Sequence, residues 1–135
     1  MSGVGRMRRG DLVAVYGLLR PASTGLDTLD ARSRVEAVRP CRIPGRLIDL
    51  GLYPGLVRGP GDVAGDLLRL KDDEVGGVLD DFEDFSPEAP AASAYRREVH
   101  RLAEPELEAW VYLWNGPADL GRVVPSGDWL ANAKR

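Results

Sequence analysis

The stretch that decides the fold is DLVAVYGLLR, residues 11–20. Its first part, residues 11–16, is a short run that is apolar on both alternating faces, which is typical of a strand buried in the middle of a sheet. Gly17 ends this run and lets the backbone turn at once. We therefore expect a central strand followed by a tight turn, and the rest of the chain has to cover both faces of that strand.

The segments that follow alternate between short strands and turns. A short helix is expected within residues 24–35, where Leu26 and Leu29 lie three positions apart. The other predicted elements are a bent or edge strand over 35–50, turns at 51–55 and 58–62, a strand over 63–70 with Gly65 at a bulge, an exposed loop over 85–94, and a hairpin of 95–103 and 107–114.

Residues 72–84 change to helical periodicity. Their apolar stripe consists of Val75, Val78, Leu79 and Phe82. Asp72 is the expected N-cap. At about 100° per residue, Asp73, Asp80 and Asp84 point away from this stripe, whereas Glu83 lies about 40° beyond Leu79, on its border.

Several short strands with only two helices predict an α+β fold, a small mixed or antiparallel β-barrel flanked by about two short helices. The length of 135 residues fits one domain, 1–135, in which we expect 1–10 and 130–135 to be flexible termini. The net charge of −3 gives no field that attracts nucleic acid or an anionic membrane. No apolar stretch has the roughly 20 residues of a membrane span, so we expect a cytoplasmic protein without nucleic acid or membrane partners.

The sequence gives little indication of a cofactor site or of a catalytic nucleophile. One cysteine, Cys41, and one histidine, His100, cannot form a zinc site of the Cys/His kind, so a metal would need carboxylates alone, and we expect neither metal nor cofactor. Both residues lie in strand-like segments, where a structural role is the favoured interpretation. No glycine-rich phosphate loop and no GxSxG motif is present.

Two places carry candidate chemistry. A carboxylate at the border of the core, such as Glu83, is partly desolvated, which raises its pKa toward the range of a group that takes and returns protons. The alternative is a solvated acidic helix face. The turn over 16–21 offers consecutive N–H groups that form a concavity for a carboxylate or an oxyanion, the alternative being a plain turn that ends a strand.

In their order, four segments resemble the gamma-glutamylcyclotransferase-like superfamily, in particular its small bacterial branch related to the AIG2-like proteins. Residues 13–20, VAVYGLLR, are similar to the family's strand and YGxLR turn. The other three are GLYPGLV at 51–57, similar to a glycine-tyrosine-proline segment, VAGDL at 63–67, similar to VxG[ED]L, and LDDFE at 79–83 with YRR at 95–97, similar to LDxxE followed by YxR.

The resemblance implies a small β-barrel flanked by helices and an enzyme without a cofactor. The family reaction releases an amine or amino acid from a small gamma-glutamyl compound, as the glutamyl α-amine closes onto the γ-carbonyl and forms 5-oxoproline. By resemblance Glu83 is the catalytic acid/base. The implied substrate-binding residues are Tyr16, Gly17, Leu18, Leu19, Arg20, Tyr95, Arg96 and Tyr112.

Some of these assignments have alternatives. Arg96 or Arg97 orients a substrate carboxylate or forms a surface ion pair, and Tyr112 lines the pocket or packs in the core. Leu18 stands where family members commonly carry Ser or Thr, and Asp84 where a glycine is common. The altered turn motivates a second hypothesis, a non-catalytic small-molecule binding or interaction module on the same scaffold. A monomer and a homodimer are both compatible with the sequence.

Overall fold

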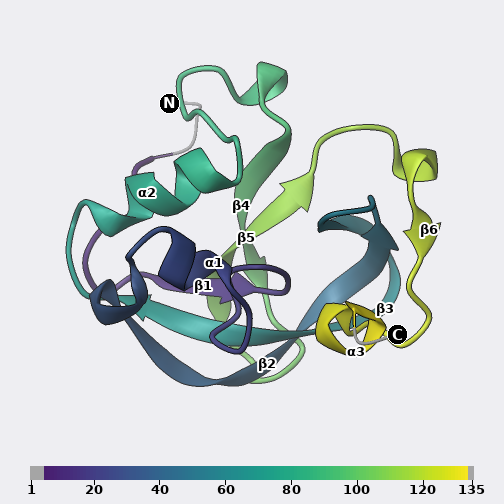
Figure 1. Cartoon of the computed structure of the whole chain (residues 1–135), viewed down its shortest axis with the longest axis horizontal. Coiled ribbons are helices and arrows are strands. Elements are labelled where there is room, and N and C mark those ends of the chain that lie inside the picture. Colours follow the sequence, from purple (N-terminus) through teal and green to yellow (C-terminus); the bar gives the residue numbers. More distant parts are fainter. Residues whose placement is uncertain (1–4, 134–135) are drawn as a thin grey trace.

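The computed structural model describes residues 5–133, and its centre is one mixed sheet of six strands that curls into a half-barrel (Figure 1). The strands are β1 (Leu12–Val15), β2 (Val35–Asp49), β3 (Pro54–Leu70), β4 (Tyr95–Arg101), β5 (Glu108–Trp114) and β6 (Arg122–Val123). The α-helices are α1 (Gly25–Thr28), α2 (Val75–Phe82) and α3 (Trp129–Ala133), with 3-10 turns η1 (Arg32–Arg34), η2 (Pro90–Ala92) and η3 (Ala118–Leu120). The strand order is β4-β5-β1-β3-β2-β6, and only the β1–β5 pair is parallel. The predicted α+β class is confirmed.

Strand β1 is central and buried on both faces, as its sequence predicts. Val13 and Val15 pack in a cluster with the apolar residues of α1 and α2. Ala14 and Tyr16 pack in a second cluster inside the curl of β2 and β3. Because both faces of β1 are covered, the turn that follows it is held between the two clusters.

The β2–β3 hairpin differs from the prediction at its middle. Arg46 pairs with Val57 and Pro44 pairs with Asp62, so residues 58–61 leave the ladder as a wide bulge. The predicted turn at 58–62 is therefore wrong, because the chain resumes the same strand instead of reversing.

Gly65 does not mark the predicted bulge. It pairs with Cys41 in regular register, and the register shift nearest to it lies between Ala37 and Arg39. A Cβ atom on Gly65 would lie 2.5 Å from the carbonyl oxygen of Val15. This glycine is required because β1 and β3 approach each other closely.

Helix α2 begins and ends with identifiable caps. Oδ1 of Asp72 accepts the N–H groups of Glu74 at 2.9 Å and Val75 at 2.7 Å, but the helix starts at Val75 and its N-cap is Glu74, so the predicted N-cap at Asp72 lies two positions too early. At the other end, Phe85 N–H donates to the Asp80 carbonyl and Asp84 adopts a positive φ of 52°. These contacts form a Schellman motif, which stops the helix at Glu83.

The two ends of the described chain are attached to the sheet. Residues 1–4 and 134–135, parts of the segments expected to be flexible, lie outside the described residues. Met7 belongs to the core cluster and Gly10 N–H donates to the Leu70 carbonyl, so residues 5–10 are anchored. Helix α3 is an element that the sequence analysis missed; Oδ1 of Asp128 accepts N–H groups at its start. Within residues 5–133 no helix is long and apolar enough to cross a membrane.

Candidate active site

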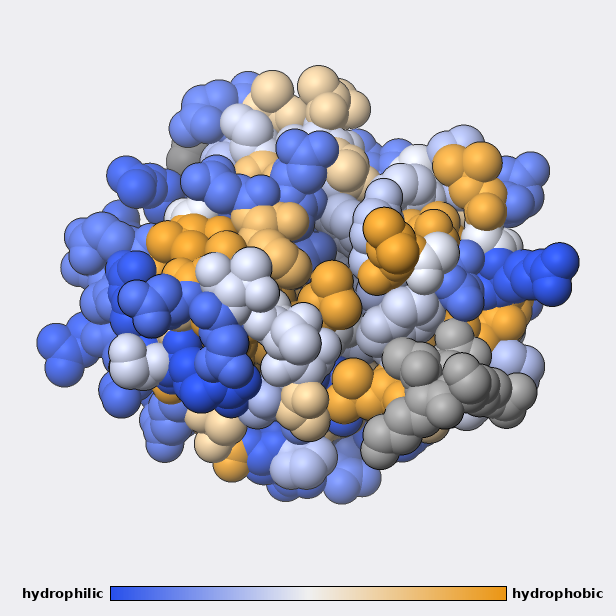
Figure 2. Space-filling view, viewed as in Figure 1, coloured by the Kyte–Doolittle hydropathy of each residue, from blue (hydrophilic) through white to orange (hydrophobic). Residues whose placement is uncertain are grey.

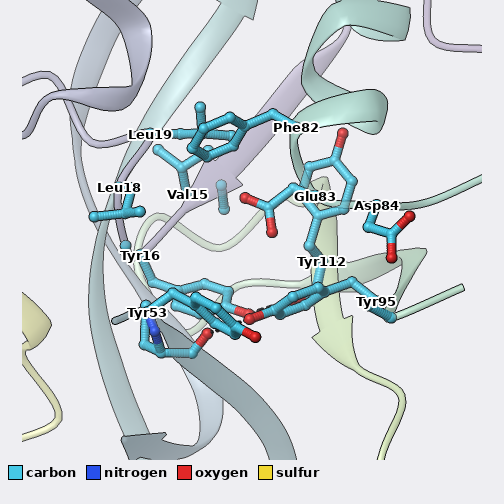
Figure 3. A pocket seen from close by; sticks show the side chains of 14 residues that line it. Val15, Tyr16, Leu18, Leu19, Tyr53, Phe82, Glu83, Asp84, Tyr95 and Tyr112 are labelled. Atoms are coloured by element: carbon cyan, nitrogen blue, oxygen red, sulfur yellow. Dashed lines mark hydrogen bonds between the residues drawn. The ribbon is translucent and has the colours of Figure 1, made fainter. Parts of the chain in front are cut away.

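A cavity of about 360 Å³ opens between the turn that follows β1, the end of α2 and the first residues of β4 (Figure 3). Its wall contains Ala14, Val15, Tyr16, Gly17, Leu18, Leu19, Tyr53, Pro54, Phe82, Glu83, Asp84, Ala94, Tyr95 and Tyr112. The two places that the sequence predicted to carry chemistry, Glu83 and the turn after the opening strand, thus share one cavity. Its size lies at the small end of the range of roughly 300 to 1,000 Å³ for small-molecule sites.

Glu83 is the acid of this cavity. It follows the last turn of α2, and in Figure 3 its carboxylate points toward the middle of the lining residues. The side chain makes no hydrogen bond or ion pair with any residue in the described part of the chain. Burial, and next the negative charge of Asp80, raise the pKa of Glu83 to about 7. Near neutral pH this group therefore exists in both protonation states, as an acid/base requires.

The turn after β1 faces Glu83 across the cavity. A Cβ atom on Gly17 would lie 2.7 Å from Cγ of Pro54, so only glycine fits between β1 and the start of β3. Within residues 5–133, the N–H groups of Gly17, Leu18 and Leu19 donate no hydrogen bond. Residues 17–19 line the cavity, so their unused N–H groups are candidate donors to an anionic group of a ligand.

Four tyrosines line the cavity, and hydrogen bonds fix the positions of three of them, Tyr16, Tyr95 and Tyr112. The Tyr16 hydroxyl donates to the Tyr112 carbonyl at 2.6 Å and accepts the Leu56 N–H at 3.1 Å. The Tyr95 hydroxyl donates to the Pro54 carbonyl. Burial first, and then the Glu83 charge, raise the pKa of Tyr16 and of Tyr95 above the ordinary value. Both phenols therefore stay neutral donors that join β1, β3, β4 and β5 around the cavity.

Behind this wall, Asp80 forms a buried ion pair with Arg97. Arg97 donates to Asp80 through Nε at 2.8 Å and a terminal nitrogen at 2.9 Å, and the Tyr112 hydroxyl donates to the same carboxylate at 2.6 Å. The guanidinium lies 4.4 Å from the Trp110 ring centre and 5.2 Å from that of Phe85. The prediction that Asp80 points away from the core is wrong, because Arg97 on β4 supplies a buried partner that makes its burial favourable.

The structure places the predicted residues in two groups. Tyr16, Gly17, Leu18, Leu19, Glu83, Tyr95 and Tyr112 all line the cavity. Arg20 and Arg96 do not: Arg20 pairs with Asp66 at 2.8 Å and with Asp128 at 3.1 Å, and Arg96 pairs with Glu98 at 3.2 Å. Arg97, the other candidate for a substrate carboxylate, pairs with Asp80 instead. Seven of the predicted catalytic and substrate-binding residues therefore lie together around the cavity.

Other lining residues were missed by the sequence analysis. Phe82 was assigned to the helix core and Tyr53 to a turn, yet both line the cavity. The proximity of Tyr53 to the motif residues depends on the β2–β3 hairpin folding back beside Tyr95, where the two ring centres lie 6.4 Å apart. A single sequence contains no signal for this long-range contact.

The candidate nucleophiles lie elsewhere. Cys41 is buried in the cluster inside the curl, and burial raises the pKa of its thiol to about 12. His100 on β4 contacts Glu98 at 3.0 Å. The structural roles predicted for both residues agree with these positions. No Ser, Thr, Cys, His or Lys contributes to the cavity wall among the described residues.

Comparisons with known proteins agree on the origin of this arrangement. Residues 13–131 match the model of a family described as gamma-glutamyl cyclotransferase, AIG2-like. A protein of Vibrio cholerae is 34% identical over 118 residues, which are 87% of this chain and 94% of that protein. The gamma-glutamylcyclotransferase family protein YtfP of Escherichia coli K12 is 34% identical over 89 residues, 66% of this chain and 71% of its own.

Solved structures show the same fold. The solution structure of Escherichia coli ytfP superposes with a TM-score of 0.66 at 28% identity and covers 90% of this chain and 98% of that one. An aig2-like protein from Mus musculus has a TM-score of 0.57 at 20% identity and covers 83% of this chain and 82% of its own. Because the family model and the full-length relative both span most of the sequence, this chain belongs to the AIG2-like gamma-glutamylcyclotransferase family.

Proposed function

We propose that this protein releases an amine or amino acid from a small γ-glutamyl compound by intramolecular cyclisation to 5-oxoproline, with Glu83 as general acid/base. One observation carries the proposal: an unpaired acid with a pKa of about 7 shares a small cavity with unused backbone N–H groups. The protein acts without a cofactor, in the cytoplasm, as a monomer or homodimer.

The proposed binding mode follows from the chemistry of the wall. The α-carboxylate of the glutamyl head accepts hydrogen bonds from the N–H groups of residues 17–19. The α-ammonium then lies toward Glu83, which holds the opposite charge once it is deprotonated. Tyr95 and Tyr112 confine the chain of the glutamyl group, so that its nitrogen and its γ-carbonyl carbon meet at bonding distance.

The reaction needs no water. Glu83 takes a proton from the α-ammonium, and the freed amine attacks the γ-carbonyl carbon, which forms the ring C–N bond. The bond from that carbon to the outgoing nitrogen then breaks. The nitrogen that becomes the ring amide loses two protons in total, and both end on the leaving amine, one of them delivered by Glu83. The described cavity wall has no Ser, Thr, Cys or Lys, and the raised pKa values of Tyr16, Tyr95 and Tyr112 keep these phenols protonated, which supports the use of the substrate's own nitrogen.

The test is turnover of a panel of γ-glutamyl amines and γ-glutamyl amino acids, with 5-oxoproline as the measured product. We expect Glu83→Gln to lower kcat by at least roughly 10³-fold with the fold retained. Asp81→Asn is the matched control, since Asp81 lies on the same helix but is exposed, and it should leave kcat unchanged. The wild-type rate should rise with pH through about 7, as Glu83 loses its proton.

A fully active Glu83→Gln variant contradicts the role of this acid. Saturable binding of the panel without any 5-oxoproline would instead support the second hypothesis, a binding module on the family scaffold. The apolar Leu18 in the turn is the feature that favours this alternative.

A further inference from the structure

We infer that the amine released by this cavity has an apolar body about the size of one aromatic ring and carries no carboxylate. The inference rests on the proposed function, because it describes the leaving group of that reaction. It follows from the charges of the cavity wall and from the shape of the wall beyond the glutamyl site.

The charge of the wall is one-sided. Among its described residues, the only side chains with a formal charge at neutral pH are the acids Glu83 and Asp84, and no Arg, Lys or His is present. A carboxylate on the leaving group would therefore enter a partly desolvated space beside acids and without a counter-ion. Burying an unpaired charge in this way is unfavourable.

The arginines near the cavity are already paired. Arg20 binds Asp66 and Asp128, Arg96 binds Glu98, and Arg97 binds Asp80. Moving any of them to a ligand would break an ion pair, and for Arg97 it would leave Asp80 buried without its partner. Among the described residues of the wall, the N–H groups at 17–19 are the carboxylate site that we assign, and the proposed binding mode gives them to the glutamyl head.

The wall beyond that head is apolar and aromatic. Tyr53, at the tip of the β2–β3 hairpin, has 42% of its surface exposed and its ring stands edge-on to Tyr95 at 62°. Phe82 from α2 and Leu18 from the opening turn lie on other sides of the same space (Figure 3). On the face seen in Figure 2, apolar groups reach the surface at the centre, between hydrophilic margins. An aromatic ring of the ligand fits such edge-to-face surroundings.

The size of the cavity limits the leaving group. At about 360 Å³ it accommodates a glutamyl head and one further ring, whereas a peptide would extend far into solvent. Tyr53 is therefore the residue that we expect to set specificity, since it forms the outer wall and belongs to a hairpin tip instead of the core.

Three synthetic amides that carry the same γ-glutamyl group and differ in the amine test the inference. They are γ-glutamyl-phenethylamide, γ-glutamylphenylalanine, which differs from the first only by a carboxylate, and γ-glutamyl-ethylamide, which lacks the ring. We expect kcat/KM for the phenethylamide to exceed that of each of the others by roughly 10- to 100-fold. Equal or better turnover of γ-glutamylphenylalanine would show that the leaving group can carry a carboxylate. Equal turnover of the ethylamide would show that the cavity does not select an aromatic ring.

Variants at the hairpin tip identify the residue responsible. Tyr53→Ala should lower kcat/KM for the phenethylamide and so reduce its ratio to the value for the ethylamide by roughly 10-fold or more. The matched control is Leu52→Ala, because Leu52 is 86% exposed and does not line the cavity. Tyr53→Arg should raise turnover of γ-glutamylphenylalanine relative to the phenethylamide by about tenfold, since it adds the missing cation.

The failure of this inference is distinct from failure of the proposed function. If none of the amides yields 5-oxoproline, the proposed function fails, and the same ranking is then measured as Kd by calorimetry on wild-type protein. If all are turned over without the expected order, the proposed function stands and the assignment of the leaving group is wrong.

Discussion

Two acids three positions apart at the end of α2, Asp80 within the helix and Glu83 as its C-cap, have opposite surroundings. Asp80 receives hydrogen bonds from Arg97 and from the Tyr112 hydroxyl, and 5% of its surface is exposed. Glu83 receives none from the described residues and faces the cavity. The same residue chemistry therefore gives a structural ion pair in one place and a titratable acid in the other, and the difference lies in the partner that β4 supplies.

The pair also shows how the structure separates stability from reactivity. Removing a partner from a buried ion pair leaves an uncompensated charge, so Asp80 contributes to the folded state. Glu83 is desolvated without compensation, so its ionised form opposes folding. Asp80 adds to this effect, because its charge raises the pKa of Glu83. The structural acid thus helps to prepare the reactive one.

The largest effect is expected for Asp80→Ala. This change leaves Arg97 buried without its counter-ion, so we expect the free energy of unfolding to fall by about 3 to 5 kcal/mol, measured by urea denaturation. The double variant Asp80→Leu with Arg97→Met should recover at least half of that loss, since it removes both charges. A loss below about 1 kcal/mol for Asp80→Ala would show that this ion pair has no structural role.

Glu83→Gln should raise the free energy of unfolding, in contrast to Asp80→Ala, and the size of this increase should depend on pH. Because the pKa of Glu83 is raised from 4.5 to about 7 on folding, its stabilising contribution is complete below 4.5 and is lost as pH rises through about 7. The variant has no charge to bury, so it should be more stable than wild type by about 3 kcal/mol near pH 9 and equal near pH 4. Denaturation of both proteins across this range is the measurement. A difference that does not vary with pH would mean that Glu83 is not desolvated.

Tyr112→Phe should have a smaller effect on stability, through Asp80. Asp80 loses one of its donors but keeps Arg97, so we expect unfolding to become easier by about 1 kcal/mol. Tyr95→Phe is the comparison, since its hydroxyl binds the Pro54 carbonyl and not an acid. The loss for Tyr112→Phe should disappear in the Asp80→Leu, Arg97→Met background, which has no acceptor at position 80, if the bond to Asp80 is its cause; a double-mutant cycle tests this.

The contrast between the two acids also marks the limit of sequence analysis here. The central strand, the hairpin of β4 and β5 and the border position of Glu83 follow from local patterns, and the structure confirms them. The burial of Asp80 does not follow from a local pattern, because helical geometry alone assigns this residue to the solvent face. Its burial depends on Arg97, which is 17 positions later in the chain and reaches it only through tertiary packing. The prediction of a turn at 58–62 was wrong for the same reason. Pairing with β2 decides whether the chain reverses there or forms a bulge, and this pairing is not visible in the local sequence.

The smallest effect concerns the residue that ends the helix just after Glu83. Asp84 holds a left-handed conformation with φ of 52°, which an L-residue adopts at a cost and glycine adopts freely. Asp84→Gly should therefore raise the free energy of unfolding by about 0.5 kcal/mol, whereas Asp81→Gly, inside the helix, should lower it by about 0.5 to 1 kcal/mol. Thermal denaturation of the two variants measures whether each substitution raises or lowers the stability of the fold. Destabilisation by Asp84→Gly would show that the aspartate side chain itself supports the position of Glu83, and the end of α2 would then be held by more than its backbone bonds.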